Sequence, residues 1–337
     1  MRNGFHKLIF SVIIFIFFIL IPPLRIYAQT DEGNENLSFV INSQRSYYGF
    51  NAGSIDQELR FRFSQQNRQN ILFIDKFENN QFYTIGAYNS KGFFVLIQDH
   101  PGSLGQNRLT PTQFDQRFLD LLIKSSRTPD VDSDGYTLNQ WVVPNSNLLF
   151  TDKYGKTIIV YSGKDDFQII ENDLPYIGIT YDYPYITFNK DLNLNDQDNL
   201  HNQLLEKIHD LDKNYSEGFG LEILTELQPL DSSLTSVLIS PNDNQVYVSL
   251  NKNADEIWRF DINGGTVETY AGFDKSHKAN IPKLGITSSD LEILNFSNED
   301  LTRGIIAIAI VILLIILFSV FVYLPRNNQT QPEESSK

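Results

Sequence analysis

The chain has 337 residues, and its 27 Lys and Arg against 41 Asp and Glu give a net charge of −14. Because an acidic surface repels phosphate backbones, this balance argues against nucleic acid as a partner. The sequence contains no cysteine, which excludes disulfides, zinc–thiolate sites and cysteine nucleophiles.

Residues 1–28 have the pattern of a secretory signal peptide. Arg2 and Lys7 precede an apolar run, Leu8–Ile21, and the small residue Ala28 follows it. The run is shorter than the roughly 20 residues that a helix needs to cross hydrocarbon. We therefore expect cleavage after Ala28 rather than a retained anchor.

The next part of the chain, to about Gln98, is typical of β-structure. Short apolar or alternating runs are separated by clusters of Gly, Asn and Ser. In Leu59–Phe63 the alternation is regular, so we expect one face of that strand to be wet. The predicted strands are Ser38–Ile41, Leu59–Phe63, Ile71–Ile74, Phe82–Gly86 and Gly92–Ile97.

A helix is predicted to begin at Thr110, which would cap it, with Pro111 in the first turn. Its apolar residues Phe114, Phe118, Leu121 and Leu122 share one stripe. After an acidic loop at 128–140, strands are expected at 148–151 and 157–161, and a second helix at 198–211.

The acidic loop contains the first seven positions of a calcium-binding loop. Asp130, Asp132 and Asp134 stand at positions 1, 3 and 5, and Tyr136 would offer its carbonyl at position 7. Position 12 is Trp141 instead of the bidentate Glu. We therefore predict a weak calcium site here, the only cofactor that the sequence indicates, and an acidic solvated turn is the alternative.

The last part of the domain is predicted to form hairpins, with strands at 235–240, 245–251, 256–262 and 266–270. The stretch Val237–Ala271 looks like one blade of a propeller, but no second copy is present. Because strands outnumber helices, and helices interrupt them twice, the sequence predicts an α+β fold with large antiparallel sheets.

Gly304–Leu324 is an uncharged, apolar segment of 21 residues, long enough to cross a bilayer as a helix. We expect a single-pass membrane protein with residues 29–303 as one extracytoplasmic domain and residues 325–337 as a short cytoplasmic tail. Without the two ends, this domain has 22 basic and 39 acidic residues.

The order of four segments resembles the linear amide C–N hydrolases, the family of choloylglycine hydrolases and penicillin V acylases. The segments are Ser38–Ile41 with Tyr47–Asn51, Asn89–Phe93, Leu148–Val160 and Ile179–Pro184. The resemblance extends over roughly residues 36–265. It implies a four-layer αββα fold of the N-terminal-nucleophile (Ntn) hydrolases, and a pocket at Asn36, Ser38, Asn51, Asp99, Tyr181 and Asp182.

The chain departs from the family where the chemistry takes place. The family's nucleophile is an N-terminal cysteine whose own amine is the base, and here the corresponding position is near Asn36. Phe50 stands in place of the family's arginine, and Asp99 in place of an oxyanion-stabilising Asn. A carboxylate would repel a developing oxyanion.

Three functions remain open. The first is a pseudoenzyme that binds a small acylated ligand or a surface protein. The second is an active amidase with a different nucleophile, Ser38 or a newly exposed Thr30. The third is an unrelated β-rich adhesion or sensor domain.

Overall fold

The computed structural model describes residues 37–42, 45–52, 58–99, 108–129, 141–144, 146–162, 167–172, 176–179, 186–187, 199–213, 216–227, 235–251, 253–295, 308 and 311–316. The predicted signal peptide, the predicted cytoplasmic tail and most of the predicted membrane span lie outside these residues. Within the described ranges, no helix has the length and apolar character needed to span a membrane.

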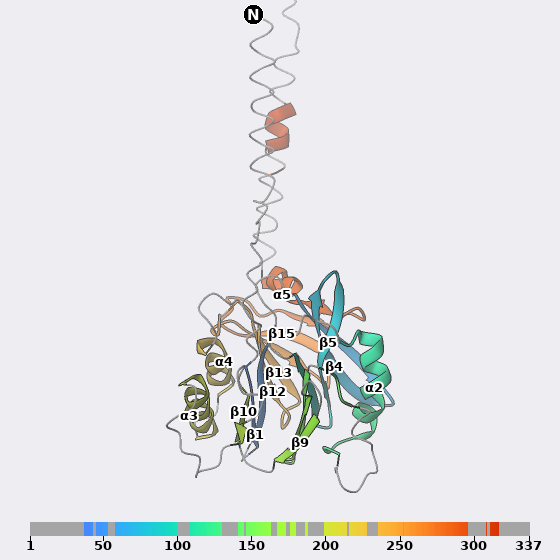
Figure 1. The fold of residues 1–337 in the computed structure, drawn as a ribbon. Helices are drawn as coiled ribbons and strands as arrows, with labels where there is room; N and C mark the ends of the chain where they lie inside the picture. The colour runs from blue at the N-terminus through green and yellow to red at the C-terminus, as the bar shows by residue number, and fades with distance from the viewer. Residues whose placement is uncertain are drawn as a thin grey trace, which may run out of the picture. The chain divides into compact units, whose positions relative to one another are not determined.

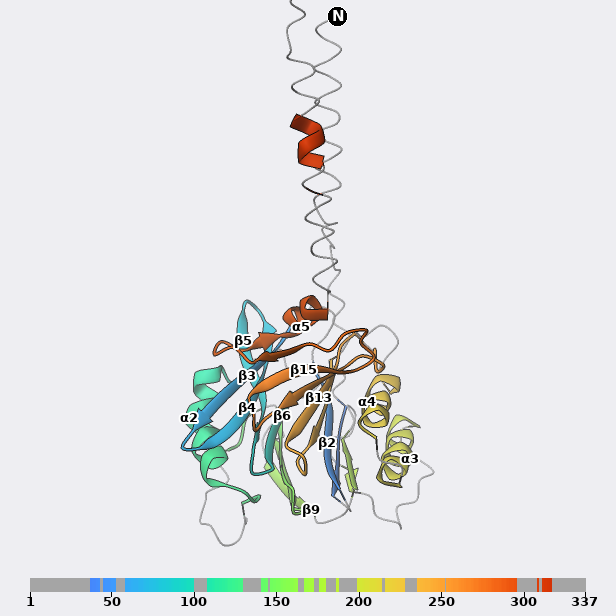
Figure 2. The same ribbon diagram turned by 180° about the vertical axis from the view of Figure 1, so that it is seen from behind.

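Two antiparallel sheets form the body of the domain (Figures 1 and 2). In the first sheet, sheet A, the strand order is β11-β10-β1-β2-β12-β13-β14-β15-β16. The first two strands of the chain lie near its centre. Its strands are β1 (Ser38–Asn42), β2 (Ser46–Ala52), β10 (Tyr176–Ile179), β11 (Ile186–Thr187), β12 (Thr235–Ser240), β13 (Gln245–Ser249), β14 (Ile257–Asp261), β15 (Thr266–Ala271) and β16 (Lys278–Asn280).

The second sheet, sheet B, is a meander that follows chain order except at one edge, where β17 joins it. Its order is β17-β3-β4-β5-β6-β7-β8-β9. Its strands are β3 (Leu59–Gln66), β4 (Gln69–Glu78), β5 (Gln81–Asn89), β6 (Phe93–Asp99), β7 (Ser146–Asp152), β8 (Thr157–Ser162), β9 (Phe167–Asn172) and β17 (Ile286–Thr287).

Helices cover the outer face of each sheet. Helix α2 (Pro111–Lys124) packs on β4 and β5, whereas α3 (Asn199–Lys213) and α4 (Glu217–Glu226) pack on β1, β10 and β12 (Figure 1). A short helix, α5 (Ser288–Asn295), follows β17. The described residues therefore form helix, sheet, sheet and helix layers, as the sequence resemblance implied.

The predicted start of α2 is confirmed. The side chain of Thr110 accepts from the backbone N–H of Gln113, and the Gln113 side chain accepts from the backbone N–H of Thr110, a capping box. Phe114, Phe118 and Leu122 of the predicted stripe are buried.

The resemblance of Val237–Ala271 to a propeller blade was misleading. Its four strands, β12 to β15, are consecutive members of sheet A. Strand β12 also pairs with β2, with Val237 opposite Phe50, so the group is not a separate blade.

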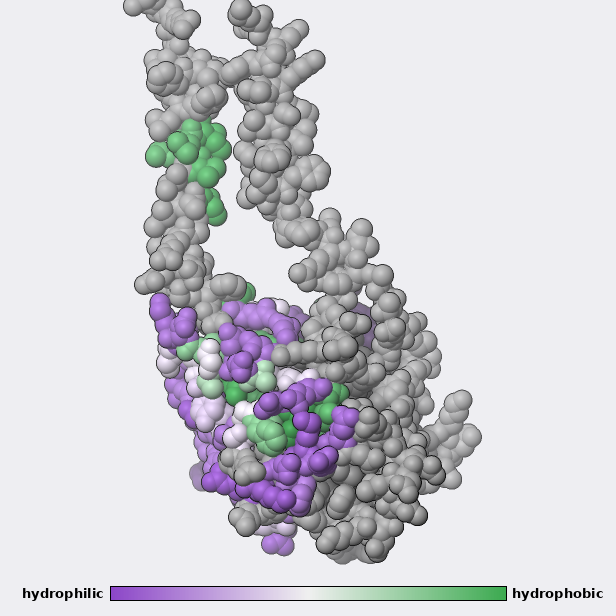
Figure 3. Space-filling model, turned by 90° about the vertical axis from the view of Figure 1, so that its left-hand side faces the viewer, coloured by the Kyte–Doolittle hydropathy of each residue, from purple (hydrophilic) through white to green (hydrophobic). Residues whose placement is uncertain are grey.

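The segment 311–316 is helical and entirely apolar. Each of its large side chains is exposed, from 49% at Val311 to 59% at Leu314. In Figure 3 this segment is uniformly hydrophobic, whereas hydrophilic side chains dominate the described surface of the two-sheet domain on the same face.

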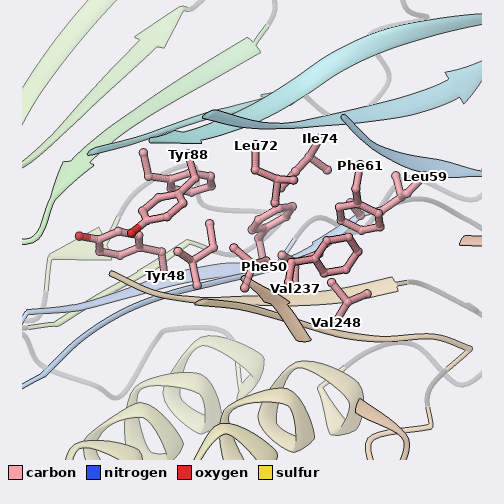
Figure 4. Close-up of a cluster of buried hydrophobic side chains, with 14 of the residues drawn as sticks. Tyr48, Phe50, Leu59, Phe61, Leu72, Ile74, Tyr88, Val237 and Val248 are labelled. Carbon is pink, nitrogen blue, oxygen red and sulfur yellow. The ribbon is translucent and has the colours of Figure 1, made fainter. Parts of the chain in front are cut away.

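The main core lies between the two sheets. Alternate residues of each strand point into it, and Figure 4 shows that Tyr48, Phe50, Val237 and Val248 of sheet A meet Leu72, Tyr88 and others of sheet B. Two smaller cores bind the helices to the outer faces. In these cores Phe114 and Phe118 contact sheet B, and Leu204, Ile208 and Leu224 contact sheet A.

The face of β3 that we expected to be wet is instead largely covered. Arg60 and Arg62 both bind Asp75 of β4, at 2.7 and 2.5 Å, and the Asp75 side chain is fully buried while each arginine is only 18% exposed. The hydroxyl of Thr84 donates to the same carboxylate at 2.7 Å. The alternation of apolar and basic residues in β3 therefore corresponds to a strand whose outer face is ion-paired rather than wet.

Breaking this network should destabilise the domain. We expect Asp75→Ala to lower the free energy of unfolding by about 3 kcal/mol, because two poorly hydrated guanidinium groups lose their counter-charge. Urea denaturation measures this. The control is Asp120→Ala, which breaks the exposed Asp120–Lys124 pair and should cost less than about 1 kcal/mol. Equal losses for the two variants would contradict the prediction.

Candidate functional site

The candidate site is the position at the start of β1, between the two sheets. The Ser38 side chain is fully buried and donates to Gln98 Oε1 of β6 across the inter-sheet space, at 3.3 Å. Gln98 is 6% exposed, and its Nε2 has no hydrogen-bond partner among the described residues. The site thus has a buried amide donor with no acceptor, an arrangement that proteins generally avoid.

Ser38 is an interior residue of its sheet. It is opposite Phe50 of β2 on one side and Ile179 of β10 on the other. Leu37 precedes it, and the carbonyl of Leu37 accepts from the backbone N–H of Asn51 at 2.9 Å. An N-terminal nucleophile requires a free α-amine beside its hydroxyl or thiol, and Ser38 has a peptide bond there.

Asn51 does not face Ser38, although the resemblance placed both in the pocket. Its Nδ2 donates to Leu224 O of α4 at 2.8 Å, and its Oδ1 accepts from Ser236 Oγ of β12 at 2.9 Å. Since successive residues of a strand point to opposite faces, Asn51 lies under the helix layer while Phe50 points between the sheets. Asn51 therefore holds α4 onto sheet A.

Phe50, which the resemblance aligns with the family's arginine, places an aromatic ring between the sheets. The ring is 1% exposed and stacks on Phe94 of β6, with 5.7 Å between centroids. The ring of Tyr48 also stacks on Phe94, again with 5.7 Å between the ring centroids. The inter-sheet space beside Ser38 is thus packed with apolar side chains rather than lined by a cation.

Two buried phenols lie farther along the same space (Figure 4). Burial raises the pKa of Tyr48 and of Tyr88 above the ordinary value for a phenol. The Tyr88 hydroxyl donates to Asn244 Oδ1 at 2.8 Å. Both phenols stay protonated at neutral pH and therefore cannot serve as general bases.

The turn that starts with Asn89, part of the resemblance, is explained by its structural contacts. The Asn89 side chain is buried, accepts from the backbone N–H groups of Lys91 and Phe93, and donates to the carbonyls of Leu122 and Ser125. It joins the β5–β6 turn to the end of α2. This motif is therefore a structural feature of the fold.

Several predicted site residues lie outside the described residues. They are Asn36, Tyr181 and Asp182 of the pocket, and Asp130, Asp132, Asp134 and Tyr136 of the calcium loop. Asp99 is the last residue of β6, and its side chain is likewise outside them. Trp141, after the loop, is buried against Phe150, 5.5 Å away. In the part of the chain that the structure describes, no three His, Asp or Glu side chains converge as metal ligands would.

Gln98 is the polar residue of this site that the sequence interpretation missed. Its signal was in the alternation of β6, where Phe94 and Leu96 point between the sheets and Gln98 continues that face. Its partner across the sheets, Ser38, could not be found from either strand alone.

No protein-family model and no curated protein matches the sequence. Solved structures do. The chain is similar to a variant of the conjugated bile acid hydrolase from Clostridium perfringens, with 13% identity, 74% of this chain and 97% of that chain covered, and a TM-score of 0.45. It is also similar to the penicillin V acylase from Agrobacterium tumefaciens, with 11% identity, coverage of 71% and 92%, and a TM-score of 0.42.

A third similar structure is the Caenorhabditis elegans ortholog of N-acylethanolamine-hydrolyzing acid amidase, with 11% identity, coverage of 61% and 92%, and a TM-score of 0.35. These likenesses to solved amide hydrolases are all at low sequence identity, and the chain contains no cysteine.

Apolar replacement should cost little stability at the Ser38–Gln98 pair and much more at Asn51. Ser38→Ala/Gln98→Met should change the free energy of unfolding by less than about 1 kcal/mol, because both partners of one hydrogen bond and one unpaired donor disappear together. Asn51→Leu should cost about 2–4 kcal/mol, because Leu224 O and Ser236 Oγ lose their partner. Chemical denaturation compares them. A greater loss for the double variant would mean that the Ser38–Gln98 pair holds the sheets together.

Proposed function

We propose that residues 29–303 form a non-catalytic, extracytoplasmic binding domain built on the scaffold of an amide hydrolase and anchored to a membrane by residues 304–324. The observation that carries this proposal is the state of the nucleophile position. The chain has no cysteine, and Ser38, the nearest described hydroxyl, is buried within a strand that is paired on both sides.

The surroundings of Ser38 support the loss of catalysis. Activation of a serine hydroxyl requires a base within hydrogen-bond reach. The partner of Ser38 is the Gln98 amide oxygen, which does not take up a proton at neutral pH. Phe50, which the resemblance aligns with the family's arginine, is an apolar ring stacked on Phe94 and cannot orient an acyl group by charge.

A binding role uses what the site retains. The Nε2 of Gln98 is a buried donor without an acceptor, and apolar side chains, among them Leu96 and Leu149, belong to the same inter-sheet core. A ligand with one carbonyl or carboxylate oxygen and an apolar portion would satisfy both. We therefore propose a small acylated molecule as the ligand of this position, reached by local opening of the sandwich.

The competing function is hydrolysis through a different nucleophile, either Ser38 or Thr30 at a shifted cleavage site. Thr30 lies outside the described residues. N-terminal sequencing of the mature chain decides whether Thr30 could begin it, since only the first residue has a free α-amine.

The purified domain should not hydrolyse acyl amides. We expect conjugated bile acids, penicillin V and N-acylethanolamines to be cleaved no faster than in buffer alone, because the chain has no cysteine and the hydroxyl of Ser38 is bonded to an amide oxygen rather than to a base. Product release measured by chromatography provides the test, with an active penicillin V acylase as positive control. Turnover that Ser38→Ala or Thr30→Ala abolishes would establish an enzyme instead.

The proposed anchor makes a separate prediction. The full chain should sediment with membranes and resist extraction at high salt or alkaline pH, because an apolar segment of 21 residues at 304–324 is long enough to span the bilayer. A chain ending at residue 303 should be released in soluble form. Replacing Ile312 and Ile315 with Asp in the full chain should have the same effect as truncation. A full chain that washes off membranes would exclude the anchor.

A further inference from the structure

A second surface, separate from the Ser38 position, combines an exposed tyrosine with three cations. Tyr154 in the β7–β8 turn is 59% exposed, the largest exposure of any aromatic side chain among the described residues. The guanidinium of Arg127 lies 4.9 Å from the centre of its ring and the ammonium of Lys153 lies 5.5 Å from it. With Lys91 these residues form what we call the cation–tyrosine patch.

Hydrogen bonds beneath this patch join the segment after α2 to the β7–β8 turn. The carboxylate of Asp152, itself 1% exposed, accepts from the backbone N–H groups of Thr128, Tyr154 and Lys156 at 2.5, 2.9 and 3.3 Å. The hydroxyl of Thr128 donates to Lys156 O at 2.9 Å. The segment that carries Arg127 is thus fixed to the turn that carries Tyr154.

The β5–β6 turn brings Lys91 to the same place. The backbone N–H of Lys153 donates to Gly92 O at 3.1 Å. The Lys153 side chain crosses directly over Gly92, where an added Cβ would lie 2.8 Å from Lys153 Cδ. Lys91, the neighbour of Gly92, donates from Nζ to Ile123 O at 3.1 Å. The patch is therefore pre-formed and needs no loop to order on binding.

The charges of the patch are not neutralised by the described part of the protein. Lys156 pairs with Glu171 and Lys124 with Asp120 nearby. No described carboxylate forms an ion pair with Lys91, Arg127 or Lys153, and the Tyr154 hydroxyl has no described hydrogen-bond partner. In a chain of net charge −14, three neighbouring cations with no described ion-pair partner are unusual.

These groups match the carboxylates of a short acidic peptide segment. A guanidinium binds a carboxylate through two parallel hydrogen bonds, an ammonium adds a point charge, and the phenol offers one more donor and an apolar face. Tyr and Arg are also the residue types that contribute most energy in protein interfaces. A long sulfated polyanion fits less well, because the acidic remainder of the protein repels it beyond the patch.

We propose that the cation–tyrosine patch binds an acidic segment of a partner protein. Its site differs from that of the proposed acyl ligand, because Gln98 lies six residues along β6 from Gly92, roughly 20 Å at about 3.3 Å per residue. Failure of one proposal therefore leaves the other intact.

The test measures binding of a fluorescent, N-acetylated octamer of glutamate to the full chain in a non-ionic detergent. We expect saturable binding at low salt that weakens as salt rises, and about tenfold weaker binding for Arg127→Gln/Lys153→Gln. Tyr154→Leu should weaken binding, whereas Tyr154→Phe should retain most of it. Binding of a fluorescent lysine octamer, measured separately, should not weaken when Arg127 and Lys153 are replaced.

The matched control is Lys213→Gln/Lys283→Gln, which removes two exposed cations outside the patch and changes the net charge equally. It should bind within twofold of the unchanged protein. Equal weakening in both double variants would overturn the proposal, since the effect would then be one of overall charge. The absence of any binding by the unchanged protein would also overturn it.

Two further outcomes would identify a different occupant and thereby reject the proposal. One is a heparin-derived octasaccharide that binds more tightly than the peptide and depends on the same two cations. The other is self-association of the full chain, measured by sedimentation, that disappears when Asp130, Asp132 and Asp134 are changed to Asn. Unchanged melting temperatures of the patch variants confirm that they remain folded.

Discussion

Face-to-face packing of the two sheets is the interaction on which the rest of the domain depends. With no cysteine in the chain, no disulfide stabilises the domain, and its stability depends on burial. The inter-sheet core supplies this with rings and branched aliphatic side chains from both sheets, for example Phe61 against Phe260 at 4.7 Å between centroids. Every other layer is attached to the outside of this pair.

The same packing accounts for the character of the candidate site. Ser38 and Gln98 of that site meet in the space between the two sheets. Here Tyr48, Phe50 and Phe94 stack across it, which increases buried apolar area and removes space for a charged group. Ser38 and Gln98 are the polar pair in this space, and Gln98 Nε2 is a donor with no described acceptor. The described site thus combines well-packed apolar side chains with a buried polar group that has no described partner.

The outer surfaces are organised by buried carboxylates and amides that bind backbone or arginine. Asp152 fixes the β7–β8 turn to the segment after α2, Asn89 fixes the β5–β6 turn to the end of that helix, and Asp75 neutralises two arginines of β3. Because these groups make several hydrogen bonds each, the turns they hold are rigid. That rigidity is what presents Tyr154 and its neighbouring cations as a fixed surface.

Local pattern in the sequence determined most strands, the capped helix α2, helix α3 and the α+β class, because alternation and capping depend on neighbours in the chain. It missed α4, where Leu221, Ile223 and Leu224 are all buried and no single apolar stripe forms. It also missed α5, the strands β9 and β10, and the strands β11, β16 and β17, which have two or three residues each.

Only the tertiary structure decided which polar residues meet. Ser38 and Gln98 are 60 positions apart and lie in different sheets. Packing of the two sheets brings them together, while the alternation of β2 turns Asn51 to the helix layer. The ion pairing of Arg60 and Arg62 depends in the same way on β3–β4 register. A sequence shows which side chains share one face of a strand. The residue that each of them meets in a neighbouring strand or in the other sheet is set by long-range pairing and packing.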